Sequence, residues 1–570
     1  MILVRVVSPP RFSLVALLEL AVVSNRRAVI ALALVSLLAF LPGVFQIPPV
    51  DRDEARFAQA AKQMIETGDY IDIRFQRDVR YKKPVGIYWM QAAVVQTANA
   101  LGLPDAAARI WLYRAPSLLG AVGSVVATYW CALAFLSRRG AGLAALMMAA
   151  STLLGVEARL AKTDAMLLFT VVVAMGALGR VYLSSRRSEI HRLGWGGIGS
   201  FWTALAVGFL IKGPIILMIV GLAAATLAII DRSARWLSAL RPIAGMGWFA
   251  LIVLPWCIAI YQRVGGAVLL NSVAEDMVAK VASGQETHGA PPGLYLLLFF
   301  VTFFPASLLA GLAAPAVWAT RREPAIRFLL AWLTPSWIIF ELVATKLPHY
   351  VLPLYPPIAI LIAGAIEAKS LWRRPWLTWG LVWWLFIPII VIIVAMAGAI
   401  MIGHSPAVAA WPFFVAALMA SLFAWRSFGD KGVELALLRA AAGAILMAIG
   451  LYAVIIPAMR PAFPSVALAA ILGRAGCEHP VAASVGYEEP SLVFLAGTNT
   501  LLTDDAASAA DFLALGACRF AFVETRQEPA FTVRAHATGL RLEPGPRIEG
   551  YNLSNGQAMT IAVYKSPAAP

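Results

Sequence analysis

Charged side chains are scarce in this sequence of 570 residues, because Asp, Glu, Lys and Arg make up only 14% of it while hydrophobic residues make up 60%. A soluble protein of this length could not cover its surface with so few charges. The mean hydropathy is +0.77, and many apolar runs are about 18–25 residues long, enough to cross a hydrocarbon core of roughly 30 Å. These runs do not alternate between apolar and polar residues, which excludes a barrel. We therefore predict a polytopic α-helical membrane protein.

Cysteine and metal-binding motifs are also scarce. The chain has four cysteines, and neither a CxxC nor an HExxH spacing occurs, so we expect no metal site and no cofactor. Cys131 and Cys257 lie in apolar runs and are expected to be packing residues. Cys477 and Cys518 share the last, soluble segment, where a disulfide and two buried free thiols both fit the sequence.

We expect about thirteen transmembrane helices from the apolar runs. No cleavable signal peptide is recognised, so the first span is expected to be an uncleaved anchor. The predicted spans are 28–46, 111–136, 140–158, 164–183, 196–212, 214–230, 243–261, 293–319, 327–344, 350–366, 376–400, 409–425 and 440–458.

The formal net charge of +15 comes largely from short loops between these spans. The positive-inside rule places such basic loops in the cytoplasm, so we expect a cytoplasmic N-terminus and a C-terminal segment on the outer side. A basic chain without nucleic-acid-binding motifs gives only a weak signal, and we expect no nucleic-acid partner. The basic loops, which alternate along the chain, are 137–140, 184–192, 231–241, 320–327, 367–374 and 426–431.

Two domains are expected, a transmembrane domain of residues 1–459 and a soluble domain of residues 460–570. In the second domain, apolar β-rich runs alternate with a helical stretch at 504–515, which predicts an α/β fold. Asn555 and Gly556 predict a hairpin turn before the last strand. The predicted strands are 481–485, 519–523 and 559–564.

Charged residues concentrate in the first long outer loop, residues 47–110. Its segment DRDEARFAQAAKQMIETGDY has apolar residues every three to four positions and predicts a short amphipathic helix. Asp53 and Glu54 lie in the first turn of this helix, and Arg56 follows them. Carboxylates in a first turn also complement the helix dipole, so the two acids are either site residues or only helix-starting residues.

The segment RYKKPVGIYWMQAAV follows in the same loop. It places Lys82 and Lys83 before a proline and an apolar, aromatic helix, in which Tyr88 and Trp89 suit the depth of a membrane interface. Cations at the start of an interfacial helix can hold a lipid phosphate. The alternative is ordinary contact with phospholipid head groups.

Further ionisable residues occur at the ends of predicted spans on this outer side, namely Asp164, Lys212, Lys346, His349 and Tyr350. Charges at membrane depth are costly, so each needs a partner or a function. A helix-end lysine that reaches the water explains Lys212 or Lys346 singly. It explains less well why all of these residues should belong to one face, and we therefore predict a site there.

The second long outer loop, residues 262–292, contributes Lys280 and His288 to the candidate residues. We find no second histidine at metal-ligand spacing from His288. A hydrogen-bonding or packing role for His288 is therefore expected over metal ligation.

The motifs DEARFAQAAKQM, RYKKPVGIYW, KTDAML, FLIKGP and KLPHYVLPLYP occur in this order. Together they resemble the lipid A aminoarabinose transferase family, relatives of the protein O-mannosyltransferases within the type-C glycosyltransferases. The tail segment GYEEPSLVFLAGTN is similar to the C-terminal domain of bacterial members. The resemblance implies a helical transmembrane fold in the inner membrane, with two juxtamembrane helices in the first periplasmic loop and a periplasmic C-terminal domain. It also implies an undecaprenyl-phosphate-linked sugar donor that is used without a nucleotide or an obligatory metal.

The resemblance also assigns expected roles to residues. The acidic residue of the family's first-loop motif falls on Asp53, and the second acidic site residue falls on Asp164. The family's phosphate-holding lysine falls on Lys83 and its tyrosine on Tyr350. Lys280, where many members have an arginine, and Lys346, from the charge pattern, complete the expected residues for binding the donor phosphate. Further site candidates are Glu54, Arg56, Lys82, Lys212, His288 and His349.

The expected function is transfer of a sugar from a polyprenyl phosphate to lipid A or another lipopolysaccharide component, with inversion at the sugar carbon. Fixed cations would stabilise the leaving phosphate, and Asp53 would act as the base for a hydroxyl acceptor. Transfer to a protein hydroxyl is the first alternative. The second is a lipid flippase or transporter, which would place its charges near the membrane midplane on broken helices.

Overall fold

The computed structural model of the chain describes residues 13–186, 194–266, 289–372, 380–430 and 432–566. Within these residues, eight helices are long and apolar enough to cross a membrane. A ninth is counted if two helices that meet at 117°, α13 (Leu294–Thr302) and α14 (Ser307–Ala319), form one broken span. The eight are Ile110–Ala132 (α5), Asp164–Ser184 (α8), Pro242–Val264 (α11), Pro324–Leu342 (α15), Pro348–Glu367, Trp383–Met401 (α18), Val408–Phe428 and Val433–Ala458.

The polytopic helical architecture predicted from the sequence is thus confirmed, but the expected number of about thirteen spans is too high for the described residues. The predicted span 28–46 is a helix of 16 residues, α2 (Asn25–Phe40). At about 1.5 Å per residue it is some 24 Å long, less than a hydrocarbon core. The predicted span 140–158 is divided between α6 (Arg138–Ala149) and α7 (Thr152–Glu157).

The remaining differences have similar causes. The predicted span 214–230 is α10 (Ile215–Ile230), again with 16 residues. The predicted span 196–212 is α9 (Trp195–Lys212), which has 18 residues but includes polar and glycine residues in its first turns and a lysine at its end. The predicted span 293–319 is the bent pair α13 and α14, which is interrupted at Pro305. Proline has no N–H to continue a helical ladder, and apolar composition alone does not reveal such a break.

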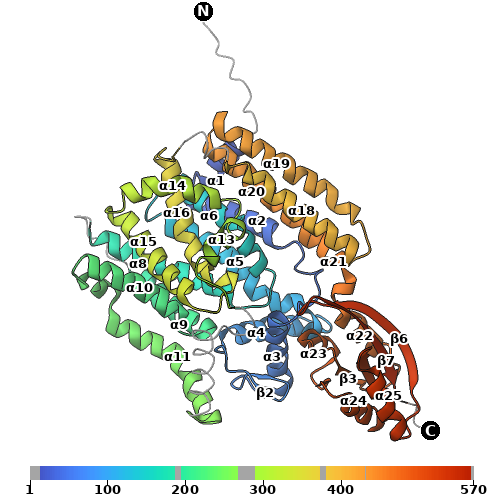
Figure 1. Cartoon of the computed structure of the whole chain (residues 1–570). Helices are drawn as coiled ribbons and strands as arrows, with labels where there is room; N and C mark the ends of the chain where they lie inside the picture. Colours follow the sequence, from blue (N-terminus) through green and yellow to red (C-terminus); the bar gives the residue numbers. More distant parts are fainter. Residues whose placement is uncertain (1–12, 187–193, 267–288, 373–379, 431, 567–570) are drawn as a thin grey trace, which may run out of the picture.

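Among the spans of the described residues, the two with the largest buried share of their most apolar window are α8 at 78% and Pro348–Glu367 at 89%. Helix α8 packs against α5, and both belong to the helical part that fills most of Figure 1. Gly120 permits this close packing, because a Cβ at that position would lie 2.7 Å from the backbone nitrogen of Met166.

Residues 47–110, named the first outer loop from the predicted topology, contain the two helices that the resemblance implies, α3 (Asp53–Thr67) and α4 (Gly86–Ala100). A short hairpin of β1 (Arg74–Phe75) and β2 (Asp78–Val79) joins them. The amphipathic character predicted for α3 is confirmed, since its apolar face packs into a core shared with α4 and the start of α5. The buried apolar residues of α3 are Ala55, Phe57, Ala58, Ala60, Ala61 and Met64.

The C-terminal region is an α/β structure, as predicted. Its five-stranded sheet has the order β4 (Leu501–Thr503), β3 (Val481–Val485), β5 (Arg519–Glu524), β7 (Gln557–Lys565) and β6 (Glu543–Asn552). The three predicted strands are β3, β5 and β7, and the hairpin turn at Asn555 and Gly556 joins β6 to β7. Strands β4 and β6 were not predicted, because β4 has only three residues and β6 is mostly exposed and contains few apolar residues.

Helices cover both faces of this sheet. One face packs on α24 (Ala506–Ala514) and α25 (Glu528–Ala537), and the other on α22 (Pro464–Gly473) and α23 (Pro490–Ala496). Cys477 and Cys518 form a disulfide within this region, so the first of the two alternatives left by the sequence holds.

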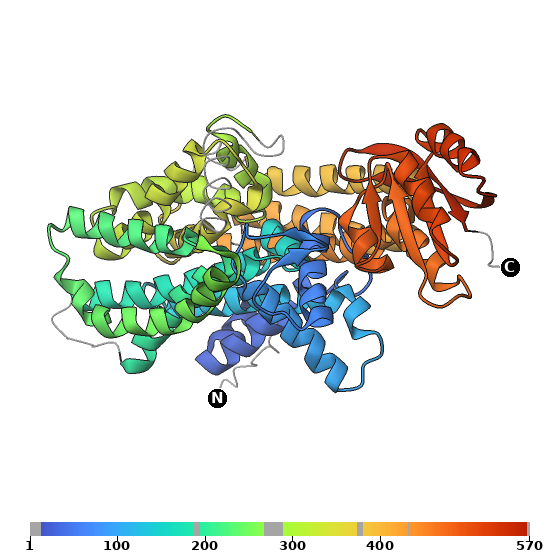
Figure 2. The ribbon, with the colours of Figure 1, turned by 90° about the horizontal axis from the view of Figure 1, so that it is seen from below.

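The α/β region lies at one side of the helical part, next to the first outer loop (Figure 2). Helix α23 packs directly against α3. Phe494 of α23 is completely buried in the core of the first outer loop, where its ring meets that of Tyr113 edge-on at 5.3 Å. The start of α3 is therefore held from two sides, by the bundle and by the α/β region.

Candidate active site

A cavity of about 280 Å³ lies at one end of the helix bundle. Asp164 at the start of α8 and Lys212 at the end of α9 reach it from the bundle, together with η4 (Pro348–Leu354). The start of α3 and the segment before α4 close it from the outer loop. Its charged or titratable lining residues are Asp51, Arg52, Asp53, Glu54, Arg56, Arg80, Lys82, Lys83, Lys162, Asp164, Lys212, His349 and Tyr350.

Most of the residues selected from the sequence are thus brought together by the fold. The lining includes Asp53, Glu54, Arg56, Lys82, Lys83, Asp164, Lys212, His349 and Tyr350. Lys280 and His288 lie outside the described residues. Lys346 is buried beside the cavity, but its ammonium donates hydrogen bonds of 2.8 and 2.6 Å to the carbonyls of Glu341 and Val343. In this position Lys346 caps the end of α15 and does not line the cavity.

The two acids at the start of α3 have different environments. Glu54 is 1% exposed and accepts two hydrogen bonds from the guanidinium of Arg114, at 2.7 and 2.8 Å. It also accepts from the backbone N–H of Val50 and of Ala161. Asp53 is exposed and faces the cavity. Glu54 therefore anchors the helix start, whereas Asp53 remains accessible to a ligand.

The backbone at this point has an unusual conformation. Arg52, immediately before α3, has φ 65° and ψ −103°, a combination that costs a non-glycine residue roughly 1–3 kcal/mol. Its guanidinium donates to the carbonyl of Ser554 in the α/β region at 3.1 Å, and Asp51 accepts from the N–H of Ser491 at 2.9 Å. Contacts from both the bundle and the α/β region hold this turn, which presents Asp53 to the cavity.

Cationic side chains outnumber carboxylates in the lining. Lys82 is exposed and Lys83 is partly buried. The guanidinium of Arg80 lies 5.1 Å from the ring centre of Phe57 and 3.4 Å from the hydroxyl of Tyr88. This segment offers several donors to an anion on the outer-loop side of the cavity.

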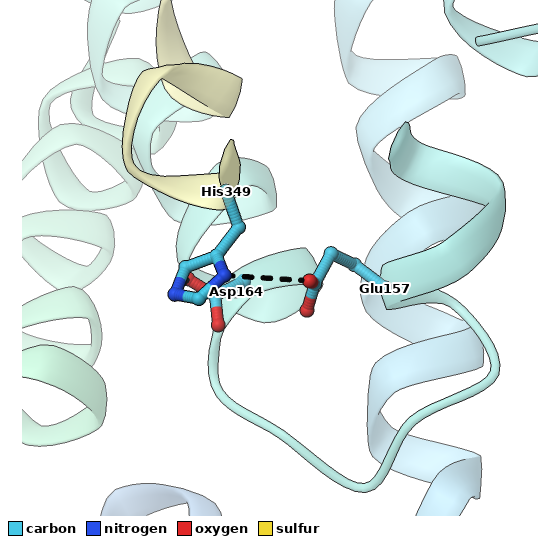
Figure 3. Close-up of side chains that lie close together, drawn as sticks. All are labelled: Glu157, Asp164 and His349. Atoms are coloured by element: carbon cyan, nitrogen blue, oxygen red, sulfur yellow. Dashed lines mark ion pairs between the residues drawn. The ribbon is translucent and has the colours of Figure 1, made fainter. Parts of the chain in front are cut away.

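A buried cluster of five side chains, the buried charge cluster, forms the bundle side of the site. Lys212 pairs with Asp164, and the ammonium of Lys162 lies 3.5 Å from Glu157. His349 lies between the two carboxylates, with Nδ1 3.7 Å from Glu157 and Nε2 3.8 Å from Asp164 (Figure 3). Asp164, Glu157 and Lys212 are each less than a tenth exposed.

Potential ligand atoms of Glu157, Asp164 and His349 lie within 4.8 Å of one another, close enough to be considered for a metal ion. Two features argue against a dication in this arrangement. Each carboxylate already faces a lysine ammonium, so the cluster has no excess negative charge. The imidazole also presents a different nitrogen to each carboxylate, whereas a single ion would be bound by only one of them.

Four further residues in or next to the site were not among the candidates selected from the sequence. Arg80 and Lys162 line the cavity, Glu157 belongs to the buried charge cluster, and Arg114 holds Glu54. Arg114 lies completely buried inside the membrane-crossing helix α5. A charge within such a run needs a partner, so its position in the predicted span 111–136 was the signal that could have revealed it.

Residues 30–271 match the family described as dolichyl-phosphate-mannose-protein mannosyltransferase. An undecaprenyl phosphate-alpha-4-amino-4-deoxy-L-arabinose arabinosyl transferase of Pseudomonas aeruginosa (strain LESB58) is 29% identical over 346 residues, which cover 59% of this chain and 60% of that protein. The protein of the same name in Pectobacterium carotovorum subsp. carotovorum (strain PC1) is 27% identical over 352 residues, which cover 60% of each chain. The sequence match thus spans about three fifths of the length of these relatives.

Solved structures extend the similarity to nearly the whole chain. The crystal structure of ArnT from Cupriavidus metallidurans in the apo state superposes with a TM-score of 0.71 and 17% identity, covering 95% of this chain and 98% of that one. The structure of the same protein bound to undecaprenyl phosphate gives a TM-score of 0.72, also with 17% identity, covering 94% and 97%. The resemblance inferred from the motifs is confirmed: the chain is similar in sequence to the aminoarabinose transferases, it shares the fold of ArnT, and its residues 30–271 match the protein mannosyltransferase family model.

Proposed function

We propose that this protein is a glycosyltransferase that moves 4-amino-4-deoxy-arabinose from undecaprenyl phosphate to lipid A. The observation that carries the proposal is the cavity itself, in which the accessible carboxylate of Asp53 lies with a group of cations at the end of a membrane-embedded bundle. The names of the similar proteins supply the sugar and the carrier. The acceptor lipid A follows from the family that the motifs resemble.

A lipid-linked phosphate suits the position of the cavity. Its bundle side is formed by helix ends, at Asp164, Lys212 and the start of η4. A polyprenyl chain can therefore remain in the hydrocarbon region while its phosphate enters the charged cavity. A transporter would need its charges near the membrane midplane, whereas these lie at one end of the spans.

Catalysis requires that the leaving phosphate be stabilised as it gains charge. Lys83 is our first choice for this role, with Arg80 and Lys82 beside it. Lys212, held by Asp164 and stacked 5.2 Å above the ring of Tyr350, is placed to assist from the bundle side. Cations that are already held in place stabilise the developing charge without having to move during the reaction. The buried carboxylate of Asp164 holds Lys212 in this way.

Asp53 is proposed to act on the acceptor. If the acceptor is a hydroxyl, its proton passes to the Asp53 carboxylate while its oxygen bonds to the sugar carbon and the electron pair of the broken bond leaves with the phosphate. If the acceptor is a phosphate of lipid A, no proton is removed and Asp53 orients the sugar or the acceptor. A single displacement inverts the configuration at the sugar carbon, so no second nucleophilic carboxylate is needed.

We further propose that the cavity and the α/β region face the periplasm and that the N-terminus is cytoplasmic. The alternating basic loops support this orientation. The disulfide between Cys477 and Cys518 supports it independently, because disulfides persist in oxidising compartments.

The test is transfer by the purified full-length protein in lipid nanodiscs, supplied with undecaprenyl phosphate-linked aminoarabinose and lipid A. Mass spectrometry should show lipid A gaining one or more aminoarabinose residues only when both donor and protein are present. The family match of residues 30–271 makes a protein hydroxyl the second candidate acceptor. Modification of a serine- and threonine-rich peptide in place of lipid A would favour that candidate, and consumption of no donor with either acceptor would contradict the proposal.

A further inference from the structure

His349 occupies an unusual position in the buried charge cluster. Its side chain is 11% exposed, it lines the cavity, and its two ring nitrogens face two different carboxylates (Figure 3). A neutral imidazole carries one N–H and can donate to only one of these carboxylates, whereas an imidazolium donates to both. The geometry therefore offers carboxylate acceptors for two N–H groups, and a neutral ring supplies only one.

Charges of the cluster balance when the imidazole is neutral. The ammonium groups of Lys162 and Lys212 offset the carboxylates of Glu157 and Asp164. One carboxylate oxygen of Glu157, Oε2, is buried and has no hydrogen-bond partner among the described residues. A buried, unpaired carboxylate oxygen is costly, so the Glu157 carboxylate, whose other oxygen Oε1 faces His349, has an unused acceptor.

Entry of an anion changes this balance, because both lysines also line the cavity. A phosphate group attracts their ammonium groups, and Glu157 and Asp164 then lose part of their compensation. The other charged or titratable groups around His349 are Lys83, in the segment before α4, and the neighbouring Tyr350. Lys83 is also drawn to a phosphate in the cavity. The phosphate thereby offsets the charge of all three lysines that face His349.

We propose that His349 takes up one proton from solvent when a phosphate monoester binds in the cavity, and that Glu157 is a positioning residue that holds the resulting imidazolium. The proposal rests on the proposed function, because that function places the phosphate there. No covalent bond changes in this step. The proton goes to the imidazole, which then donates to Glu157 and Asp164. Phosphate binding is consequently coupled to proton uptake and becomes weaker as the pH rises, by at most about tenfold per pH unit.

The test is calorimetric titration of the full-length protein in nanodiscs with undecaprenyl phosphate, in two buffers that differ in ionisation enthalpy. The difference between the buffers gives the protons exchanged per bound ligand. Changes in the ionisation of the ligand are common to all variants, so variants are compared with one another. The wild-type protein should take up more protons than His349→Gln, by a difference approaching one. Glu157→Gln should reduce the uptake partly.

His536→Gln is the matched control, because His536 lies exposed on α25 in the α/β region. It should keep the wild-type proton number. Equal proton numbers in the wild type, His349→Gln and Glu157→Gln would overturn the proposal. A stoichiometric divalent metal that co-purifies with the wild type and is lost in His349→Gln would also overturn it, in favour of a metal site. If no variant binds undecaprenyl phosphate at all, the proposed function fails, which is distinct from binding without proton uptake.

Discussion

Asp53 and Glu54 are neighbours in the sequence, yet one is exposed in the cavity and the other is buried against Arg114. The sequence placed both in the first turn of a helix and could not separate a site residue from a structural one. The separation depends on Arg114, which is distant in the chain and meets Glu54 only in the folded protein. At this scale, the chemical type of a site residue is predictable from a motif, but its partner is not.

The Glu54–Arg114 pair gives a stability prediction. Arg114→Ala should lower the free energy of unfolding by about 3–5 kcal/mol, because it leaves the Glu54 carboxylate buried without its cation. Thermal unfolding in detergent measures this change. Arg77→Ala, at an exposed arginine of the same outer loop, is the control and should shift stability little. Equal stability of the two variants would show that the buried pair does not anchor α3.

Lys83 and Lys82 form a second pair with different predicted effects. Lys83→Ala should lower kcat/KM by about ten- to hundredfold and raise KM for the donor, because it removes a partly buried cation that the ground-state phosphate already contacts. Lys82 is exposed, so screening by solvent should make Lys82→Ala the milder variant. Steady-state kinetics with varied donor concentration distinguish them, and a larger effect of Lys82→Ala would reverse the assignment.

Lys346 shows what a motif leaves open at the scale of a single residue. Lys346 was expected to bind phosphate, but it caps the carbonyls at the end of α15. A lysine near a span end fits either role, and the sequence contains nothing that decides between a carbonyl and a ligand. Glu157 lies in the same segment as Asp164 but was not selected as a candidate, since its contact with His349 joins segments far apart in the chain.

At the scale of elements, α3 is the helix where the α/β region meets the rest of the molecule. Lys62 donates to the carbonyl of Phe494 at 2.8 Å, and Gln59 donates to Thr498 at 2.7 Å. These bonds run along the face of α3 that lies beside α23. Because Asp53 is the first residue of α3, the α/β region is mechanically connected to the cavity.

Phe494→Ala tests this connection. Loss of a fully buried aromatic ring should destabilise the junction by about 3–5 kcal/mol and reduce transfer at temperatures where the protein stays folded. Phe531→Ala is the matched control, because Phe531 is equally buried but packs within the α/β core, against Tyr564. Transfer rates and far-UV circular dichroism should be compared. If both variants lose the same activity, the contact with α3 has no special role.

Asp51 makes this junction dependent on pH. Burial, together with the nearby Glu489 and Glu54, raises the pKa of the Asp51 carboxyl to about 7, in spite of its hydrogen bonds with Ser491. The folded protein then holds this proton more tightly than the unfolded chain does, whose aspartates titrate near 4. The contribution of Asp51 to stability should therefore fall as the pH rises from about 4 to about 7, and level off above that.

Asp51→Asn should remove this dependence and raise the melting temperature at pH 8 more than at pH 5. Asp505 is a control for which the pH dependence of stability should have the opposite sign, since hydrogen bonds from Ser508 and Ala507 lower the pKa of its carboxyl. Its stabilising contribution is lost as the pH falls. A melting-temperature difference between Asp51→Asn and the wild type that stays constant from pH 5 to pH 8 would contradict the prediction.

Element prediction succeeded where the local pattern was strong. The amphipathic helix α3, the strands β3, β5 and β7, and the Asn-Gly turn all follow from periodicity or turn chemistry within a few residues. It failed for the short helices of the bundle, which hydropathy alone lengthened into full spans. Burial inside a bundle and exposure to lipid favour the same apolar residues, so composition does not distinguish a short packed helix from a membrane-crossing one.

For the whole molecule, the order of motifs along the chain predicted more than any one motif did. Five short segments from distant parts of the sequence were expected to share one face, and all five contribute to the cavity. The prediction worked because charges in an apolar chain are too costly to be scattered at random. The position of the α/β region against α3 had no counterpart in the sequence, because it depends on surface complementarity between regions that are far apart in the chain.

The account as a whole depends on Asp53 acting chemically in the cavity. The most direct measurement compares transfer of aminoarabinose to lipid A by the purified wild type, by Asp53→Asn, and by Asp78→Asn, an exposed aspartate of the same loop that does not line the cavity. Asn keeps the size of Asp and serves nearly as well near a helix start, so folding should be unchanged. We expect Asp53→Asn to lose transfer by about 10²–10⁴-fold while Asp78→Asn keeps it. Transfer by Asp53→Asn at a rate close to that of the wild type would contradict the account and leave Asp164 as the next candidate.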